Sequence, residues 1–150
     1  KKVSPVADPT IYICSPNDSK MVPEGNESWF MLINAPRHDP VNGVDWSDSE
    51  LRHSYTEQIL TALKNRGFST EGRISWQQTV TPDDLERNTL APGGSIYGTS
   101  SNGMRSAFLR PENVTKIPNL YLVGGSSHPG GGLPLVGMSA EIVASHIGRA

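Results

Sequence analysis

The feature that most constrains this chain is a glycine-dense stretch near its C-terminus, at residues 124–132. The apolar run before it, residues 120–123, predicts a short buried strand, and the small residues after it predict a helix from about Pro134 to Ile147. Because glycine has no side chain, the backbone of such a loop can approach a ligand closely. A helix N-terminus adds unpaired N–H groups and a positive dipole end, which favour an anion or an electron-rich carbonyl. The pattern therefore predicts half of a nucleotide or flavin site.

The predicted C-terminal helix has slim first turns, because Gly137, Ser139 and Ala140 are small. Two interpretations are open. Slim turns allow the helix end to approach a bound ring system, and they also allow a helix to pack closely on a sheet. The expected buried stripe of this helix is Val136, Ala140, Val143, Ala144 and Ile147.

Composition excludes several classes of protein. The 150 residues suffice for one core, and a net charge of −2 without a basic cluster argues against nucleic-acid binding. The single cysteine, Cys14, can form neither an internal disulfide nor a thiolate metal cluster, and we expect a small strand residue there. No apolar run approaches the roughly 20 residues that span a bilayer. The chain opens on Lys1 without an initiator methionine, which we interpret as an internal start.

The N-terminal half predicts two strands and a helix. Residues 10–14 and 28–34 are rich in β-forming residues and predict antiparallel strands joined by a long connection. A helix is expected over residues 48–65, opened by a capping box between Ser47 and Glu50. Its predicted apolar face is Leu51, Tyr55, Ile59, Leu60 and Leu63.

The middle of the chain predicts shorter elements. Residues 73–80 are a strand candidate, and Thr81 with Pro82 predicts the N-cap and first position of a short helix. Residues 93–98 predict a brief strand edged by glycines, and residues 108–111 close a polar loop. The acids at the start of the short helix, Asp83, Asp84 and Glu86, are typical of a first helical turn rather than of a catalytic pair.

The order of these segments resembles one protein family. The quoted motifs are PEG at residues 23–25, VTPDDLE at 80–86, GGSIYG at 93–98, RP at 110–111 and NLYLVGGSSHPGGG at 119–132. In this order they resemble the C-terminal part of bacterial phytoene-desaturase-type carotenoid oxidoreductases. These are FAD enzymes of the wider amine-oxidase-like flavoprotein superfamily, and the resemblance covers essentially the whole chain.

The resemblance implies an α+β flavoprotein segment with two domain parts. Residues 1–113 would belong to the substrate-binding domain, as a sheet with its covering helix. Residues 114–150 would supply the terminal strand, glycine loop and helix of a Rossmann-like FAD-binding domain. The Gly-x-Gly-x-x-Gly turn that binds the ADP pyrophosphate has no match in the sequence. We therefore expect a C-terminal segment of a larger flavoprotein, inactive by itself.

The resemblance also implies where FAD binds. Gly124 and Gly125 would lie near the pyrophosphate and ribityl chain, and the helix would point its N-terminus at the pyrimidine edge of the isoalloxazine. There the backbone N–H groups from residues 135–138 would stabilise negative charge on the reduced flavin. Many relatives in the superfamily carry an acidic residue where this chain has Gly125, so no ribityl-binding side chain is predicted. The full set of predicted cofactor-binding residues is Gly124, Gly125, Ser126, Gly132, Leu133, Pro134, Leu135, Val136, Gly137 and Met138.

No catalytic residue is assigned, because hydride abstraction from a polyene by a flavin does not demand a protein acid or base. His128 is the one candidate, either as a proton relay or through hydrogen bonds that order the loop. Arg110 could contact the cofactor or pin the loop. The other histidines, His38, His53 and His146, show no metal-ligand spacing, so no metal is expected.

Three functions remain open from the sequence. The first is an FAD-dependent dehydrogenase or isomerase of a long, hydrophobic isoprenoid or carotenoid-like substrate. The second is an amine-oxidase-like flavin dehydrogenase of a polar small molecule, although no acidic or aromatic cage is visible. The third is a non-catalytic α+β domain that binds a partner. Under the first, the partners are the remainder of the same polypeptide and the substrate, in the cytoplasm, with peripheral membrane contact left open.

Overall fold

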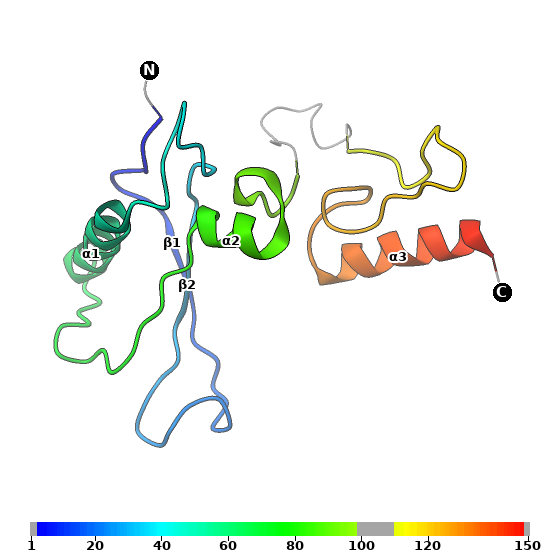
Figure 1. Cartoon of the computed structure of the whole chain (residues 1–150). Helices are drawn as coiled ribbons and strands as arrows, with labels where there is room; N and C mark the ends of the chain where they lie inside the picture. Colours follow the sequence, from blue (N-terminus) through cyan, green and yellow to red (C-terminus); the bar gives the residue numbers. More distant parts are fainter. Residues whose placement is uncertain (1–2, 99–109, 149–150) are drawn as a thin grey trace. The chain divides into compact units, whose positions relative to one another are not determined.

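The computed structural model describes residues 3–98 and 110–148. Two compact units divide the chain, Lys1–Gly94 and Ser95–Ala150. The first contains the strands β1 (Ile11–Cys14) and β2 (Phe30–Ile33), the helices α1 (Ser49–Asn65) and α2 (Pro82–Thr89), and the 3₁₀ turn η1 (Pro92–Gly94); the second contains α3 (Leu133–Ile147) (Figure 1). The described part is therefore α+β. The predicted domain boundary after residue 113 concerns the domains of a longer protein and stays a prediction.

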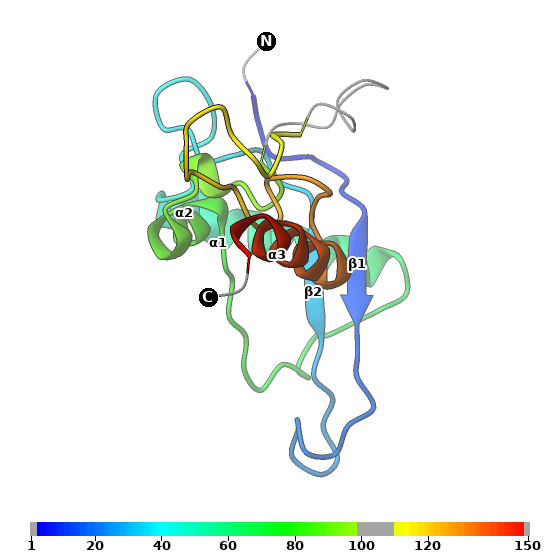
Figure 2. The ribbon, with the colours of Figure 1, turned by 90° about the vertical axis from the view of Figure 1, so that its right-hand side faces the viewer.

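The sheet confirms the two predicted N-terminal strands. β1 and β2 pair antiparallel, with Ile11 opposite Ile33 and Cys14 opposite Phe30. Alternation along the strands gives the sheet a half-buried face and an exposed face. α1 crosses one face of this sheet, as the two ribbon views together show (Figures 1 and 2). The exposed face carries Tyr12, Cys14, Phe30 and Leu32.

The long predicted helix is confirmed as α1, but its N-cap is not Ser47. Asp48 is the N-cap, and its carboxylate accepts the backbone N–H groups of Glu50 and Leu51. A carboxylate is a strong acceptor at a helix N-terminus, and here it is one residue closer to the first turn. The hydroxyl of Ser47 instead donates to Asp45. The predicted capping box is therefore wrong: the N-cap lies one residue later, and Leu51, three residues after Asp48, has no polar side chain to complete a box.

The apolar face of α1 is buried most deeply near its C-terminal half. Ile59 is 5% exposed and Leu63 is 2% exposed. Leu51, Leu60 and Tyr55 are half-buried, and the ring of Tyr55 lies 5.7 Å from that of the buried Trp46. The predicted face is correct, and it forms the core of the first unit together with the loop residues Val44 and Trp46.

Residues 73–80 do not form the predicted strand. They are irregular and exposed along their whole length. A strand is stable only when a neighbour completes its hydrogen bonds, and within the described residues β1 and β2 pair only with each other. High β-propensity alone is therefore not enough to make this segment a strand.

The short helix is confirmed as α2, whereas the glycine-edged strand after it is wrong. Residues 92–98 form η1 and a series of bends. Gly93, Gly94 and Gly98 have φ values of +68°, +69° and +75°. These values lie in the left-handed region, so the backbone cannot extend as a strand.

In the second unit the C-terminal helix is confirmed, but the strand before it is wrong. α3 begins at Leu133, one residue before Pro134. Residues 120–123 contribute a single bridge, between Tyr121 and Val114, and Val123 is 59% exposed. The described residues place no neighbouring strand beside this segment that could bury it.

The buried stripe of α3 also differs from the prediction. Val143 is buried and Val136 is half-buried, but Ala140, Ala144 and Ile147 are exposed, and the deepest residue is Ser139 at 0% exposure. The polar loop predicted to end at residues 108–111 lies mostly outside the described residues. No helix in the described ranges is long and apolar enough to cross a membrane.

Candidate functional site

The predicted site begins where the glycine loop enters α3. Gly132 is the N-cap residue, with a φ of +107°, and Pro134 occupies the first turn. No side chain of the described residues caps this end of the helix. Val136 donates its N–H to the carbonyl of Gly132 at 2.9 Å, so this predicted donor is already used inside the helix. In the part of the chain that the structure describes, the N–H groups of Leu133 and Leu135 have no acceptor, and Pro134 has no N–H.

The glycines of the loop and of the first turns of α3 fall into two groups, according to what surrounds their Cα atoms. A Cβ on Gly124, Gly132 or Gly137 would meet no described atom within 4 Å. A Cβ on Gly131 would lie 2.0 Å from the ring of Tyr97, so that glycine permits close packing within the unit. The first group therefore presents open backbone, which is the property that a close-fitting cofactor requires.

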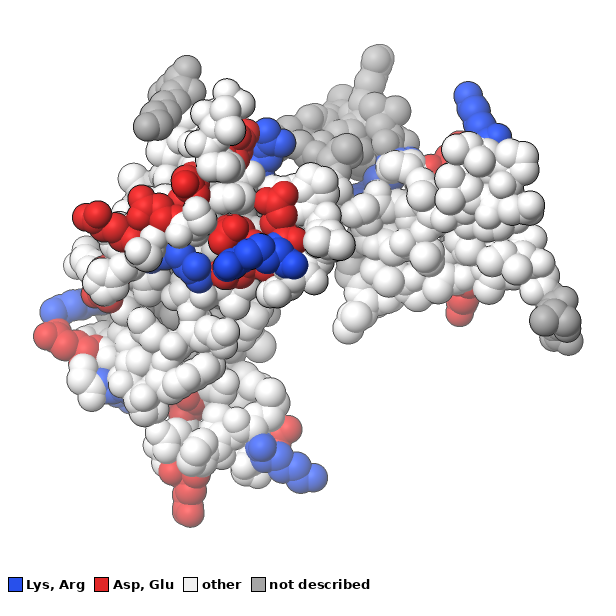
Figure 3. Space-filling view, in the orientation of Figure 1, with Lys and Arg blue, Asp and Glu red and all other residues white. Residues whose placement is uncertain are grey.

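The other predicted cofactor-binding residues belong to the glycine loop and to the first turns of α3. Ser126 lies at the loop, 3.0 Å from where a Cβ of Gly98 would stand. The apolar side chains at the start of α3 are exposed, with Leu133 at 90%, Leu135 at 37% and Met138 at 50%. Charged side chains are sparse on the α3 part of the surface in Figure 3, in contrast to the part around α1 and α2. The structure therefore gathers the predicted residues at one end of α3, and their role stays a prediction.

Arg110 holds the loop from inside. Its Nη1 donates to the carbonyl of Gly125 at 2.8 Å and to that of Tyr97 at 2.9 Å. A Cβ on Gly130 would lie 3.2 Å from Arg110 Nε. Of the two roles open for Arg110, the structure thus shows the loop-pinning one.

His128 orders the loop through its backbone rather than its imidazole. Its N–H donates to the carbonyl of Pro111 at 2.9 Å. The residue is exposed, and its ring makes no hydrogen bond with the described residues. A role for the imidazole as a proton relay stays a hypothesis.

A buried polar cluster under the loop was missed by the sequence reasoning. Asn113, Ser127 and Ser139 are all buried, and they hydrogen-bond to one another and to the backbone of Gly124 and Leu122. One signal for it was present in the sequence, because Ser139 lies three residues after Val136 and four before Val143, on the helix face that they share. Nothing in the sequence indicated that Asn113, which lies far from Ser139 along the chain, would join the cluster.

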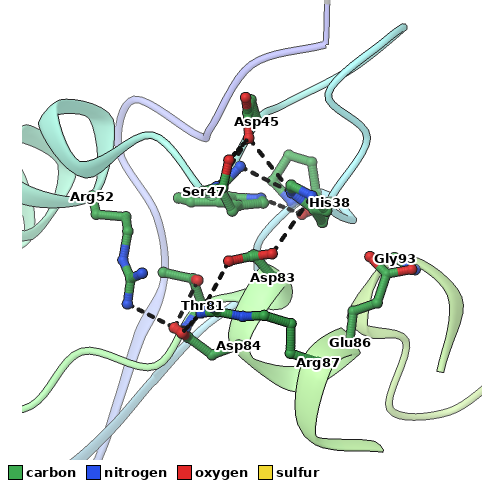
Figure 4. A network of polar contacts seen from close by, with 12 residues as sticks. His38, Asp45, Ser47, Arg52, Thr81, Asp83, Asp84, Glu86, Arg87 and Gly93 are labelled. Carbon is green, nitrogen blue, oxygen red and sulfur yellow. Dashed lines mark hydrogen bonds and ion pairs between the residues drawn. The ribbon is translucent and has the colours of Figure 1, made fainter. Parts of the chain in front are cut away.

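A second polar network lies in the first unit, around the start of α2 (Figure 4). The N–H of Trp46 donates to His38 Nδ1 at 3.1 Å, and His38 Nε2 faces the Asp83 carboxylate at 3.7 Å. Asp83 also pairs with Arg87 at 3.1 Å. His38 therefore links the loop before α1 with helix α2. Its partners, Trp46 and Asp83, indicate a structural role.

Asp84 completes this network as the capping acid of α2. Its Oδ2 accepts the N–H and the hydroxyl of Thr81, and it pairs with Arg52 at 2.7 Å. Burial favours a higher pKa for the Asp84 carboxyl, but the Thr81 hydrogen bonds and the two arginines outweigh it and hold the pKa below its ordinary value. Glu86 accepts the N–H of Gly93. Asp83 and Asp84 are thus first-turn acids with structural contacts, as the sequence predicted, whereas Glu86 lies beyond the first turn and bonds to the backbone of Gly93.

Comparison with known proteins finds close relatives. The chain is 40% identical over 144 residues to a 1-hydroxycarotenoid 3,4-desaturase of Flavobacterium sp. (strain P99-3), covering 93% of this chain and 28% of the relative. It is 35% identical to a 4,4'-diapolycopen-4-al dehydrogenase of Metabacillus indicus, covering 94% and 28%. It is 32% identical to a 4,4'-diapophytoene desaturase (4,4'-diaponeurosporene-forming) of Staphylococcus aureus (strain Newman), covering 93% and 29%. The chain thus spans less than a third of the length of these curated relatives. No family profile matches it.

Proposed function

The chain belongs to the phytoene-desaturase-like family of carotenoid desaturases and corresponds to a C-terminal part of its members, and we propose that it is part of an FAD-dependent oxidoreductase. The substrate we propose is a long isoprenoid or carotenoid-like polyene, which the whole protein dehydrogenates or isomerises. The observation that carries the proposal is the open glycine backbone at the uncapped start of α3, in a chain 40% identical to a named carotenoid desaturase.

The residues at this end of α3 fit a flavin cofactor. Gly124, Gly132 and Gly137 leave room for a ring system or a phosphate chain to touch the backbone. FAD, when bound, supplies the acceptor for a hydride from an unactivated polyene. The free N–H groups of Leu133 and Leu135 would face an electron-rich edge of the cofactor, where the positive end of the helix dipole stabilises negative charge.

The remaining parts of the proposal rest on the family. The unit that contains β1, β2 and α1 would belong to the substrate-binding domain, and α3 with its glycine loop to a Rossmann-like FAD-binding domain. The relatives reported above are named as carotenoid desaturases and as a diapolycopenal dehydrogenase. This favours the polyene over the amine-oxidase-like alternative.

The test is purification of the full-length protein, followed by measurement of bound flavin and of polyene conversion. We expect yellow protein with FAD absorbance, and a red shift of the polyene spectrum as conjugation lengthens. Gly124→Ala should lower the FAD content, because the added Cβ would occupy the open space beside the backbone, and a φ of +119° disfavours any residue with a Cβ. Gly148→Ala is the matched control, since Gly148 also has a positive φ, of +84°, and open space, but lies at the far end of α3. Full-length protein that carries no flavin, or that oxidises an amine and no polyene, contradicts the proposal.

A further inference from the structure

The side chain of Ser139 lies at the centre of a hydrogen-bond cluster in which the donor and the acceptor of every bond can be assigned. Its Oγ accepts an N–H from Asn113 Nδ2 at 2.8 Å and the backbone N–H of Gly124 at 3.1 Å. A hydroxyl has two acceptor positions and one proton. Both acceptor positions of Ser139 are therefore filled, and its proton remains for the third neighbour, Ser127 Oγ, at 3.3 Å.

The hydroxyl of Ser127 continues the chain of hydrogen bonds from Ser139 to the backbone of Gly124. Ser127 Oγ donates to the carbonyl of Gly124 at 3.0 Å, so its one proton is already used and it accepts from Ser139. The backbone N–H of Ser127 also donates to the carbonyl of Gly124, at 3.2 Å. Both polar backbone groups of Gly124 are thus bound to serines of the cluster.

Asn113 fixes the segment that leads into the glycine loop. Its side-chain Nδ2 donates to the carbonyl of Leu122 at 2.8 Å, and its backbone carbonyl accepts the N–H of Leu122 at 2.8 Å. One residue therefore holds both backbone groups of Leu122. Asn113 and Ser127 are each 4% exposed and Ser139 is 0% exposed, so water does not compete for these bonds.

From this geometry we infer that Asn113, Ser127 and Ser139 are positioning residues of the cofactor site, which hold Gly124 with its polar groups turned inward and its bare Cα turned to open space. Gly124 then meets the cofactor by van der Waals contact and not as an N–H donor. The inference rests on the proposed function, because it assumes that the open side of Gly124 faces FAD. It assigns to three buried side chains a role that acts through Gly124 and not through their own contact with the cofactor.

The consequence of breaking the cluster follows from the unsatisfied groups. Ser139→Ala removes one oxygen and leaves the N–H groups of Asn113 and Gly124 without their buried acceptor. Gly124 is then free to turn its N–H outward, and the surface that meets the cofactor is lost. We expect FAD to bind to the full-length protein about tenfold more weakly. Asn113→Ala should act similarly, because it removes the donor to both Leu122 and Ser139.

The matched control is Ser145→Ala on the same helix. Ser145 is exposed, and among the described residues its hydroxyl donates only to the carbonyl of Ile142 in the preceding turn. The substitution removes the same atom from α3 without touching the glycine loop. Its dissociation constant for FAD should stay within about twofold of the wild type.

The measurement is titration of flavin-stripped, full-length protein with FAD, below the melting transition of every variant and with folding checked by circular dichroism. A role in stability alone would lower the melting temperature and leave the dissociation constant unchanged. The double variant Ser139→Ala/Asn113→Ala should lose no more affinity than the weaker-binding single variant, because both belong to one network.

Three results contradict the inference in different ways. If wild-type protein binds FAD and both single variants, folded, bind it equally well, the positioning role is wrong and the proposed function stands. If full-length wild-type protein binds no FAD, the proposed function fails and the positioning role fails with it. Additive losses in the double variant would contradict the single network, because independent sites add.

Discussion

At the scale of single residues, Gly94 shows how a missing side chain fixes the turn after α2. A Cβ at this position would lie 2.0 Å from the carbonyl oxygen of Pro82, and the φ is +69°. Gly72 has nearly the same φ, +68°, but no described atom lies within 4 Å of its Cβ position. The two glycines therefore separate backbone strain from steric clash.

We predict that Gly94→Ala lowers the free energy of unfolding of the 150-residue chain by at least about 3 kcal/mol, from strain and clash together. Gly72→Ala should cost only about 1–2 kcal/mol, because it adds the strain of a left-handed residue alone. Urea denaturation followed by circular dichroism measures both. Equal losses for the two variants would show that α2 and η1 separate easily to admit the methyl group.

At the scale of secondary structure, α1 depends on its buried face. Ile59 is 5% exposed, whereas Thr61, two residues further along the same helix, is exposed. We predict that Ile59→Ala lowers the free energy of unfolding by about 2–5 kcal/mol, because it leaves a cavity in the core of the first unit. Thr61→Ala should change it by no more than about 0.5 kcal/mol. Urea titration of both variants is the measurement, and a small loss at Ile59 would mean that α1 packs on nothing.

At the scale of the whole molecule, the chain holds only part of the predicted cofactor site. Its sequence has no Gly-x-Gly-x-x-Gly turn for the ADP pyrophosphate. We predict that the isolated 150-residue chain binds FAD weakly or not at all, since the turn that binds the ADP pyrophosphate is missing and any loop residue that must be ordered costs about 1–2 kcal/mol of backbone entropy. Titration with FAD, followed by flavin fluorescence, decides this. Stoichiometric quenching at micromolar FAD would mean that the chain carries a complete site.

The extent of the chain also accounts for large apolar side chains that are exposed in its described part. Phe30 is 62% exposed and Tyr12 is 58% exposed on the outer face of the sheet, and Val123 is 59% exposed before the glycine loop. Large apolar side chains grouped on an exposed face are typical of a surface that contacts another part of a protein. Their exposure agrees with a chain that spans less than a third of the length of its relatives.

The sequence by itself determined the elements whose signals are local. β1, α1, α2 and α3 lie where β-propensity, helical periodicity, the Thr81–Pro82 start and the Pro134 start predicted them. The glycine loop was also visible from the sequence, as was the resemblance that the comparisons confirm at the level of the family. These signals are local because a cap, a turn or an amphipathic period involves residues within a few positions of one another.

Only the tertiary structure decided which segments find partners. Residues 73–80 and 120–123 have strand-like sequences, but a strand exists only where another strand supplies its hydrogen bonds. Likewise Ser139, and not Ala140, is buried because Asn113 and the backbone of Gly124 meet its hydroxyl. These contacts join residues that are 15 and 26 positions apart in sequence. Such pairings depend on the folded path of the chain, and local propensity carries no information about them.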